Sequence, residues 1–217
     1  MIGRPRVHHA VTGSTNERAK ELAATGAPHG TLVTADEQSA GRGRQGRTWV
    51  APRRSAVLMS LVLREYDALL PLRAAVAVAE AVGSEEIKWP NDVWIGGRKV
   101  AGILVEGRPA EGWAVLGIGL NVEPVEFPPD LHAVALDDGR SLEDVLAGLL
   151  GRLDDRLKAE DVLAAWRARD ALEGRAVGWV GGAGGVAAGI DESGALLVDT
   201  ADGRVALQAG EVHLRLE

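Results

Sequence analysis

A cationic, glycine-rich segment is the part of the chain best suited to chemistry. Residues 41 to 49 read Gly-Arg-Gly-Arg-Gln-Gly-Arg-Thr-Trp, and residues 39 to 54 contain five arginines and no acidic residue. Glycine allows the backbone to approach a ligand closely, and guanidinium groups present planar donors to phosphate and carboxylate oxygens. Because the whole chain has a net charge of -7, this segment predicts a local site for a small phosphorylated ligand. A solvated loop whose arginines pair with carboxylates elsewhere explains the composition equally well.

Two of the four lysines lie in a second candidate segment. Lys88 begins the run Lys-Trp-Pro-Asn-Asp at 88 to 92, and Lys99 is followed by Val-Ala-Gly-Ile-Leu-Val-Glu up to residue 106. A lysine at the start of a buried strand can place its ammonium group where negative charge develops during group transfer, and Gly102 would let a ligand lie against the strand. An edge-strand charge is the alternative for Lys88, and we favour that alternative more for Lys88 than for Lys99. Asn91 and Asp92 are equally consistent with an ordinary turn.

Two weaker signals flank these segments. Gly117 and Gly119 alternate along an apolar run, which would clear one face of a strand, and Asn121 could offer an amide to a base edge. Glycine in a strand often marks only a bulge. Ser-Thr-Asn at 14 to 16 precedes Glu17, and this spacing predicts a helix capping box that would by itself account for these polar residues.

Several kinds of chemistry are excluded by residue type or spacing. The chain has no cysteine, which removes disulfides, thiolate ligands and cysteine nucleophiles. Its five histidines lie in unrelated contexts and show no zinc-ligand spacing. The arginine–glycine segment lacks the Gly-Lys-Ser/Thr ending of a P-loop and the spacing of a dinucleotide fingerprint. Among the six tryptophans, Trp49, Trp89 and Trp94 fall near the candidate site, whereas we expect Trp113, Trp166 and Trp179 to serve packing.

The elements that must position these residues follow from hydrophobic periodicity. The pattern predicts a near-continuous buried strand at 56–63 and a hairpin turning at Gly96 and Gly97. Proline in the first turn and glycine after the end delimit a helix at 71–82. The full set of expected elements is strands at 31–35, 56–63, 86–89, 93–95, 100–106 and 113–122 and helices at 14–24, 71–82, 141–158 and 161–172.

The character of the chain changes near Gly174. From there on it is glycine-rich, with short alternating runs at 187–190, 195–198, 205–207 and 212–216 separated by turns, which predicts a small all-β unit appended to an α+β domain. We expect a catalytic domain at 1–172 and a C-terminal β domain at 173–217. No run of about 18 apolar residues predicts a membrane helix, the N-terminus lacks a secretory signal pattern, and we expect a cytoplasmic protein. The acidic balance, with a sequence pI of about 5.3, argues against a dedicated DNA binder.

Taken together and in order, these motifs resemble the biotin–protein ligases, that is, the biotin–[acetyl-CoA-carboxylase] ligases. The resemblance covers essentially the whole chain. It rests on Ser-Thr-Asn at 14–16, Gln38 with the loop at 41–49, Lys-Trp-Pro-Asn-Asp at 88–92, the run at 99–106 and Gly-Ile-Gly-Leu-Asn at 117–121, with the β tail beside them.

The resemblance implies an α+β fold: a class II synthetase-like catalytic domain with a mixed β-sheet flanked by helices, followed by a small SH3-like β-barrel. It implies two half-reactions, in which biotin and Mg-ATP form biotinyl-5′-AMP and the biotin then passes to a lysine of a biotin carboxyl carrier domain. It also implies a monofunctional ligase, because a DNA-binding domain would have no room before residue 14. A homodimer through the catalytic sheet is compatible with it, and neither a nucleic acid nor a membrane is an expected partner.

Residue by residue, the resemblance divides the site into three groups. Lys99 and Arg44 are the expected catalytic residues, supported by Arg47 and by Mg²⁺. Trp49 and Asn121 are expected to hold the adenine, Gly102 and Gly119 to make room, and Asp92 to contact ribose or metal, although the metal ligands stay unknown. Biotin and its carboxylate are assigned to Ser14, Thr15, Asn16, Gln38, Arg42, Gly43, Arg44 and Lys99. The glycines of the 41–49 loop lead us to expect a lid that closes over biotinyl-adenylate.

Two rival functions remain at this stage. A lipoate–protein ligase or octanoyltransferase would share the catalytic-domain ancestry, but the complete arginine–glycine loop and Lys-Trp-Pro-Asn-Asp favour biotin. A nucleic-acid-binding module would use the same arginines against many phosphates and would bind in a strongly salt-dependent way. The net charge of -7 speaks against that module.

Overall fold

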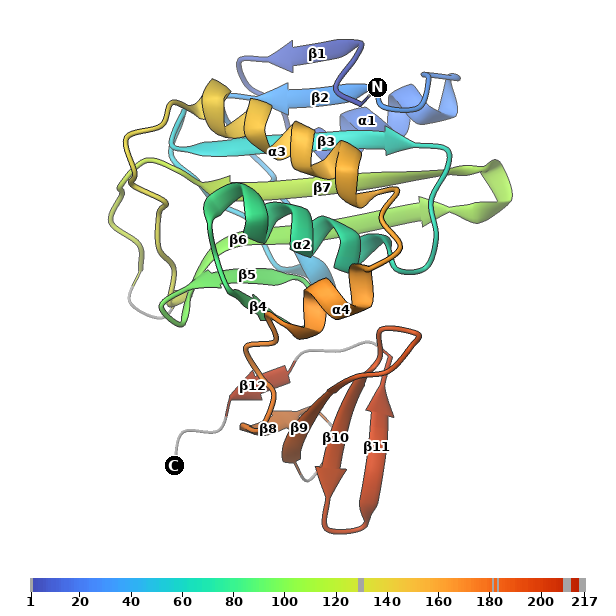
Figure 1. Ribbon diagram of the computed structural model, residues 1–217. Coiled ribbons are helices and arrows are strands. Elements are labelled where there is room, and N and C mark those ends of the chain that lie inside the picture. The colour runs from blue at the N-terminus through green and yellow to red at the C-terminus, as the bar shows by residue number, and fades with distance from the viewer. Residues whose placement is uncertain (1, 129–130, 181, 183, 209–211, 215–217) are drawn as a thin grey trace.

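Two β-sheets of unequal size form the framework of the protein (Figure 1). The computed structural model describes residues 2–128, 131–180, 182, 184–208 and 212–214. The larger sheet has the strand order β1-β2-β3-β7-β6-β5-β4, in which β1 and β2 are parallel and the other neighbours are antiparallel. Its strands are β1 Arg6–His9, β2 Leu32–Ala35, β3 Ala56–Leu63, β4 Glu86–Lys88, β5 Asp92–Ile95, β6 Arg98–Arg108 and β7 Trp113–Asn121.

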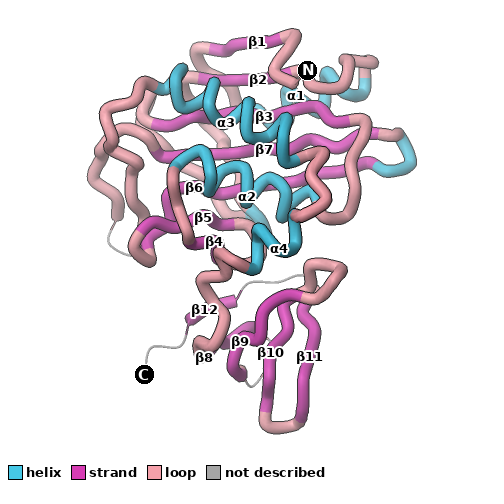
Figure 2. The backbone as a smooth tube through the Cα atoms, in the orientation of Figure 1, coloured by secondary structure: helices cyan, strands magenta, loops and turns pink. Residues whose placement is uncertain are grey.

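Helices cover the two faces of this sheet unequally. α2 (Leu70–Val82) and α3 (Leu142–Arg156) lie over one face, with α4 (Val162–Arg167) near its lower edge (Figures 1 and 2). α1 (Thr15–Ala24) lies on the opposite face, against β3 and β7. The main core lies on the α2–α3 side, and a smaller cluster beneath α1 includes Ala19, Val62 and Val115. The apolar core therefore covers a smaller part of the sheet on the α1 side than on the α2–α3 side.

Most expected elements are present for the reasons that the sequence suggested. β3 is buried at all of its positions, as a near-continuous apolar run predicts. α2 has proline in its first turn and ends at Gly83, whose φ of 70° is left-handed. The Ser141 side chain accepts a hydrogen bond from the Asp144 backbone N–H at the start of α3. Gly96 and Gly97 both have positive φ in the turn between β5 and β6.

Two local predictions were wrong. Ser14 is the N-cap residue of α1, but its side chain makes no capping hydrogen bond. The Gln38 side chain satisfies another N–H at the start of this helix, because its Oε1 accepts the Thr15 backbone N–H at 2.7 Å. The helix expected at 161–172 ends at Arg167, and the following residues pair with β4 instead: Ile87 N–H donates to Arg169 O at 2.7 Å. A backbone pairing at a sheet edge satisfies the same groups that a longer helix would have satisfied.

Two strands had no clear signal in the sequence. β1 reads Arg-Val-His-His and alternates between exposed and partly buried residues. β8 (Ala176–Trp179) begins the C-terminal sheet, whose order is β11-β10-β9-β8-β12. Its other strands are β9 Gly185–Ile190, β10 Leu196–Thr200, β11 Gly203–Leu207 and β12 Val212–Leu214. The run expected at 212–216 extends beyond the described residues.

The C-terminal sheet packs against the larger sheet through shared contacts. The Trp89 indole N–H donates to Gly194 O at 3.0 Å, and the Arg167 guanidinium donates to Ile190 O at 3.0 Å. Residues of both parts, such as Trp89 and Leu196, belong to one continuous hydrophobic cluster. The domain boundary expected between residues 172 and 173 stays a prediction. Within the described residues, no helix combines the length and the apolar character needed to cross a bilayer.

Candidate active site

The antiparallel register brings residues from five strands into one row on the α1 side of the large sheet. Leu58 of β3 pairs with Gly119 of β7, Gly119 pairs with Gly102 of β6, Gly102 pairs with Asp92 of β5, and Asp92 pairs with Lys88 of β4. Paired residues point to the same face of a sheet. The row therefore carries two side-chain-free positions in its centre and opposite charges at one end.

Trp49 occupies the space above the two glycines of this row. A Cβ atom on Gly119 would lie 2.5 Å from Trp49 Cε2, and one on Gly102 would lie 3.1 Å from Trp49 Cζ3. The glycines thus leave room for an indole ring that the arginine–glycine segment supplies. The sequence predicted that Gly102 and Gly119 make room for a ligand. In the structure this room is filled by the Trp49 side chain, which is itself expected to contact the ligand.

Lys99 and Asp92 form the charged end of the site. Lys99 Nζ lies 2.7 Å from Asp92 Oδ1 and 5.6 Å from the centre of the Trp49 ring. Burial lowers the pKa of Lys88, and the positive charges of Lys99 and Arg47 lower it further against the opposing effect of Asp92. Lys88 lies on the edge strand β4, as the interpretation of an edge-strand charge expects. Its pKa nevertheless responds to the charges of Asp92, Lys99 and Arg47, so it is part of the same charged group. Its ammonium group also lies 5.6 Å from the Trp94 ring centre.

Arg44 joins this group of cations from the loop. Burial lowers the pKa of its guanidinium, and Asp92 partly counteracts that effect. Several cations thus gather around one carboxylate, and the excess of positive charge is suited to an anionic ligand. Among the described residues no cluster of three acidic or histidine side chains could hold a metal ion. Asp92, the residue expected to contact ribose or metal, is paired with Lys99.

A buried polar network lies beside the glycine row. Ser60 of β3 donates to Asn16 Oδ1 at 2.6 Å and contacts Thr15 Oγ1 at 2.8 Å. The Thr15 hydroxyl donates to Gln38 Oε1 at 3.0 Å. A side chain on Gly117 would overlap the Asn16 carboxamide. The network fixes the orientation of two amides, as fully satisfied buried polar groups do.

Sequence reasoning missed Ser60 as part of this network. Ser60 is the one polar residue in the run 56–63, and it is fully buried. A lone hydroxyl in a strand buried on both faces must find a hydrogen-bond partner. That argument could have singled it out.

The arginine–glycine segment folds into a tight hairpin-like loop. Gly43 N–H donates to Arg47 O at 2.7 Å, and Trp49 N–H donates to Gly41 O at 3.0 Å. The turn between them is a short 3₁₀ segment, Arg44–Gly46, in which Gln45 has a φ of 54°. These bonds place Arg44 and Trp49 on the site. Closure of this loop upon ligand binding stays a prediction.

The remaining arginines of this region have different positions. Arg42 Nη1 lies 2.7 Å from Glu17 Oε1 of α1. Arg53 and Arg54 lie 3.7 Å and 3.5 Å from Asp36 carboxylate oxygens. All three are exposed arginines paired with a carboxylate, as the alternative interpretation of this segment expects.

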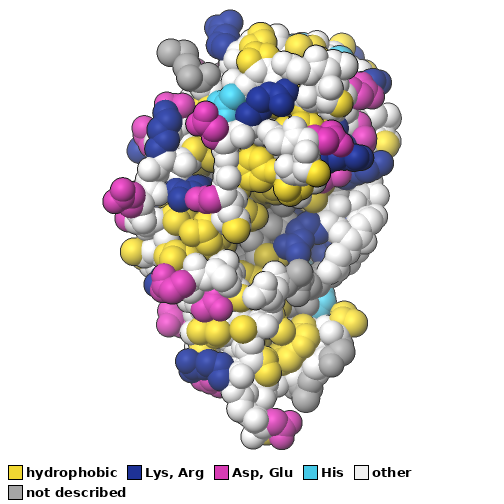
Figure 3. Space-filling view, turned by 90° about the vertical axis from the view of Figure 1, so that its right-hand side faces the viewer, with side chains coloured by type: hydrophobic (Ala, Val, Ile, Leu, Met, Phe, Trp, Pro, Cys, Tyr) yellow, Lys and Arg dark blue, Asp and Glu magenta, His cyan; other side chains and the backbone are white. Residues whose placement is uncertain are grey.

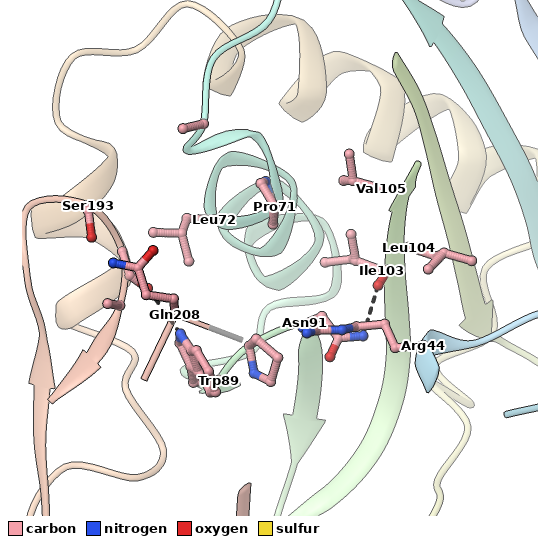
Figure 4. Close-up of a pocket in the computed structure, with 14 residues that line it drawn as sticks. Arg44, Pro71, Leu72, Trp89, Asn91, Ile103, Leu104, Val105, Ser193 and Gln208 are labelled. Carbon is pink, nitrogen blue, oxygen red and sulfur yellow. Dashed lines mark hydrogen bonds between the residues drawn. The ribbon is translucent and has the colours of Figure 1, made fainter. Parts of the chain in front are cut away.

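Two pockets adjoin the site. One, of about 560 Å³, lies between residues 40–48 of the loop and Leu104–Val105–Glu106 of β6. The other, of about 290 Å³, lies between the large sheet and the C-terminal part, and its walls include Trp89, Asn91 and Gln208 (Figure 4). Arg44 lines both pockets. A space-filling view turned by 90° shows a hollow at mid-height, with basic side chains at its surface (Figure 3).

Two asparagines secure the backbone around the site. Asn91 Nδ2 donates to Ile103 O at 2.8 Å, which ties the turn before β5 to β6. Asn121 Nδ2 donates to Val134 O at 3.2 Å, and Lys99 N–H donates to His132 O at 2.8 Å. The segment after β7 therefore holds both Asn121 and the backbone of Lys99. Asn91, which the sequence explained as a turn residue, also links that turn to β6 through its side chain.

The sequence-predicted residues thus come from four separate segments but lie around one surface. Ser14 is buried at the start of α1 beside Thr15, and Gly43 packs against Arg47. The whole expected set is Ser14, Thr15, Asn16, Gln38, Arg42, Gly43, Arg44, Arg47, Trp49, Lys99, Gly102, Gly119 and Asn121. Their individual roles toward a ligand remain predictions.

Comparison with known proteins agrees with this arrangement. The family profile "Biotin/lipoate A/B protein ligase family" matches residues 9–123, which is more than half of the chain. The chain belongs to that family. A second profile, "Biotin protein ligase C terminal domain", matches residues 183–215 of this ligase. The expectations of an α+β ligase fold and a C-terminal β domain are confirmed.

Individual relatives indicate which enzymes of this family the chain is similar to. The ligase is 38% identical to a biotin–[acetyl-CoA-carboxylase] ligase of Mycobacterium tuberculosis, over 95% of this chain and 88% of the relative. It is 37% identical to the enzyme of the same description from Paracoccus denitrificans, over 94% of this chain and 98% of the relative. The structure of Aquifex aeolicus biotin protein ligase in complex with biotin and ATP superposes with a TM-score of 0.84 at 28% identity, covering 99% of this chain and 100% of that one. The expectation of a biotin–protein ligase is confirmed at the level of family and enzyme class.

Proposed function

We propose that this ligase joins biotin to ATP and then transfers the biotin to a lysine of a biotin carboxyl carrier domain. In the first step a biotin carboxylate oxygen bonds to the α-phosphorus of ATP, and the bond to pyrophosphate breaks. In the second step the lysine nitrogen bonds to the biotinyl carbon, loses a proton, and AMP leaves. The observation that carries this proposal is the convergence of Lys99, Arg44 and Trp49 on the glycine-cleared row, beside a pocket of about 560 Å³.

Biotin is assigned to the loop pocket and the polar network next to it. Its ureido ring has both donors and acceptors, which hydroxyls and amides can match. Ser14, Thr15, Asn16 and Gln38 are the proposed partners of that ring. Gly43 and Arg42 would contribute from the loop. The hydrogen bonds of Thr15, Asn16 and Gln38 support the proposal, because they hold these three side chains in one geometry before a ligand arrives.

The cations are assigned to the reacting groups. A carboxylate and a phosphate repel each other, so their reaction requires positive charge that is already in place. Lys99 and Arg44 are the proposed catalytic residues, with Arg47 beside them. Asp92 keeps the Lys99 ammonium directed toward the row at 2.7 Å. As a contact of ribose or metal, Asp92 would first have to release this lysine.

Trp49 and Asn121 are the proposed contacts of the adenine. An indole ring offers a flat apolar surface for stacking. Gly102 and Gly119 let that ring lie close to the sheet. Mg²⁺, when bound, would neutralise phosphate charge as part of the Mg-ATP substrate.

The partners of the reaction are part of the same proposal. A carrier domain must bring its lysine to the acyl-phosphate, and ATP consumption favours a cytoplasmic enzyme. A homodimer through the catalytic sheet would use the outer edge of β1, since the edge of β4 already pairs with residues 169–171 through Ile87. Sedimentation at several protein concentrations tests that dimer.

One experiment decides the proposed function. The ligase is incubated with Mg-ATP, a carrier domain and either biotin or lipoate, and the carrier is weighed by mass spectrometry. We expect one biotin per carrier and no lipoyl product, and a carrier whose acceptor lysine is replaced by arginine serves as the control. An unmodified carrier with biotin, together with a lipoyl adduct, would contradict the assignment.

A further inference from the structure

Four charged side chains tie both walls of the loop pocket to helix α1. Arg42 belongs to the loop wall of that pocket, and Glu106 belongs to the β6 wall. Glu17 and Lys20 lie three positions apart on α1, so they share one face of the helix. They connect the two walls from outside the pocket.

The contacts run in an unbroken chain. Arg42 Nη1 lies 2.7 Å from Glu17 Oε1, and the same carboxylate oxygen accepts Lys20 Nζ at 2.7 Å. Lys20 Nζ also lies 2.8 Å from Glu106 Oε1. The other oxygen of Glu106 accepts a hydrogen bond from Asn16 Nδ2 at 2.8 Å. The chain therefore ends on one of the buried amides of the polar network.

The ionisation of the middle members supports a coupled set. Burial by itself would lower the pKa of Lys20, but its hydrogen bonds to Glu106 and Glu17 raise it overall. Burial would raise the pKa of Glu106, but the hydrogen bonds from Lys20 and Asn16 lower it overall. Both groups are therefore held in their charged forms, and each depends on the other.

We propose that Glu17 and Lys20 are positioning residues that, with Arg42 and Glu106, form a charged clasp holding the loop pocket closed. The inference rests on the proposed function, because it takes this pocket as the biotin site. Neither Glu17 nor Lys20 lines the pocket. They act on the ligand through the loop backbone and through Asn16.

The clasp has a definite physical consequence. Opening the loop must separate Arg42 from Glu17, which adds to the free energy of the open state. A ligand bound in the closed pocket then dissociates more slowly, while the reacting groups stay where they were. The clasp thus controls binding and retention of biotin and its adenylate rather than the rate of adenylate formation.

Replacing Glu17 tests the clasp with little change in shape. Glu17→Gln keeps the volume of the side chain and removes the charge that attracts Arg42 and Lys20. We expect the Kd for biotin and the dissociation rate of biotinyl-5′-AMP to rise by about threefold to fivefold, the effect of one partly exposed ion pair. The kcat of biotin-dependent pyrophosphate release should stay within about twofold, because Lys99 and Arg44 are untouched.

Glu21→Gln is the matched control on the same helix. Glu21 pairs with Arg18 at 2.8 Å, also three positions apart, and both side chains are exposed away from the pocket. This variant should bind biotin like the unmodified ligase. Unfolding temperatures of both variants, measured without ligand, show whether either change acts through stability alone.

Two further measurements separate a clasp from a merely structural role. In about 1 M salt the Debye length falls to about 3 Å and the exposed side of the pair is screened, so the affinity ratio between unmodified ligase and Glu17→Gln should become smaller than it is at low salt. In a double-mutant cycle, Arg42→Gln should cost less in the Glu17→Gln background than alone. Additive effects, or an unchanged Kd and dissociation rate in Glu17→Gln, overturn the clasp. Failure of the unmodified ligase to bind biotin would instead overturn the proposed function.

Discussion

Strand β7 shows how differently the two faces of the large sheet are built. Leu116, Ile118 and Leu120 point toward α2 and α3 and are almost completely buried in the main core. Gly117, Gly119 and Asn121 alternate with them on the other face, where Asn16 and Trp49 fill the space. One face therefore gains stability from buried apolar area. At positions 117, 119 and 121 the other face forgoes that gain, so that polar and aromatic groups from distant segments can approach the backbone.

Side chains that alternate along one strand can therefore build the core on one face of the sheet and a binding site on the other. The apolar positions of β7 make the strand, and the small or polar positions make the site. If this division is correct, substitutions on the two faces should affect different properties. Changes on the α2–α3 face should reduce stability, and changes at positions 117, 119 and 121 on the α1 face should reduce activity.

The largest effect is expected on the apolar face. Leu116→Ala removes a fully buried side chain from the core and should lower the free energy of unfolding by about 2–5 kcal/mol. Urea denaturation measures this loss. Activity per folded molecule should persist, since Leu116 points away from the site. A stable variant with low activity would contradict the division of faces.

The next effect is expected at the charged end of the site. Lys99→Ala should reduce biotin-dependent pyrophosphate release by about 10²–10³-fold, the typical loss when one preorganised charge that stabilises a transition state is removed. Its stability should change little, because Lys99 is partly exposed. Lys158→Ala, which breaks an exposed pair with Asp154 on α3, is the control and should keep full activity. Normal release by Lys99→Ala would remove Lys99 from catalysis.

A smaller effect is expected where a glycine admits the indole ring. In Gly119→Ala the new methyl group would lie 2.5 Å from Trp49 Cε2, so the ring must move. We expect the KM for ATP to rise by about tenfold, because uniform binding of the adenine is weakened. Gly148→Ala in α3, where the added methyl group meets no atom within 4 Å, serves as the control. An unchanged KM would show that Trp49 does not hold the nucleotide.

The smallest effect concerns a carboxyl group on the apolar side. Asp170 pairs in register with the buried Ile87, and burial raises the pKa of Asp170 from 3.8 to about 6. Because the folded state holds this proton more tightly than the unfolded state, the stabilisation is present below about pH 4 and is lost as the pH rises to about 6. The full shift corresponds to about 3 kcal/mol, and partial solvent exposure reduces it to about 1–2 kcal/mol.

Asp170→Asn isolates this contribution because asparagine does not ionise. Its free energy of unfolding should exceed that of the unmodified ligase by about 1–2 kcal/mol near pH 7 and equal it near pH 4. Urea denaturation at both pH values gives the comparison. A difference that does not depend on pH would mean that Asp170 is not held as a neutral acid.

Much of the fold was predictable from local patterns. The apolar run of β3, the proline and glycine around α2 and the glycine pair between β5 and β6 each act over a few residues. The predictions that were wrong concern places where contacts with distant parts of the chain determine the local structure. The helix expected to reach residue 172 ends at Arg167 because the chain can pair with Ile87 at the edge of β4. The Ser14 side chain makes no capping bond, and Gln38, 23 positions farther along the chain, accepts the first backbone N–H of α1.

The candidate site was predictable as a set of residue types but not as an arrangement. Lys99, Arg44 and Trp49 were recognisable from their motifs. Ser60, Glu17 and Lys20 were not, because their importance comes from partners on other elements. Glu106, for example, accepts a hydrogen bond from Lys20, which lies 86 positions away in the sequence.

The sequence by itself determined the alternation on each strand, the glycines that leave space and the excess of arginine in one short segment. Tertiary structure decided which of these meet. The register of five strands places Gly119, Gly102 and Asp92 in one row, and the loop hairpin lays Trp49 upon it. Register depends on how the whole sheet buries its apolar face, because a shift by one residue would turn every side chain to the wrong side. No local pattern contains that information, and the packed core supplies it.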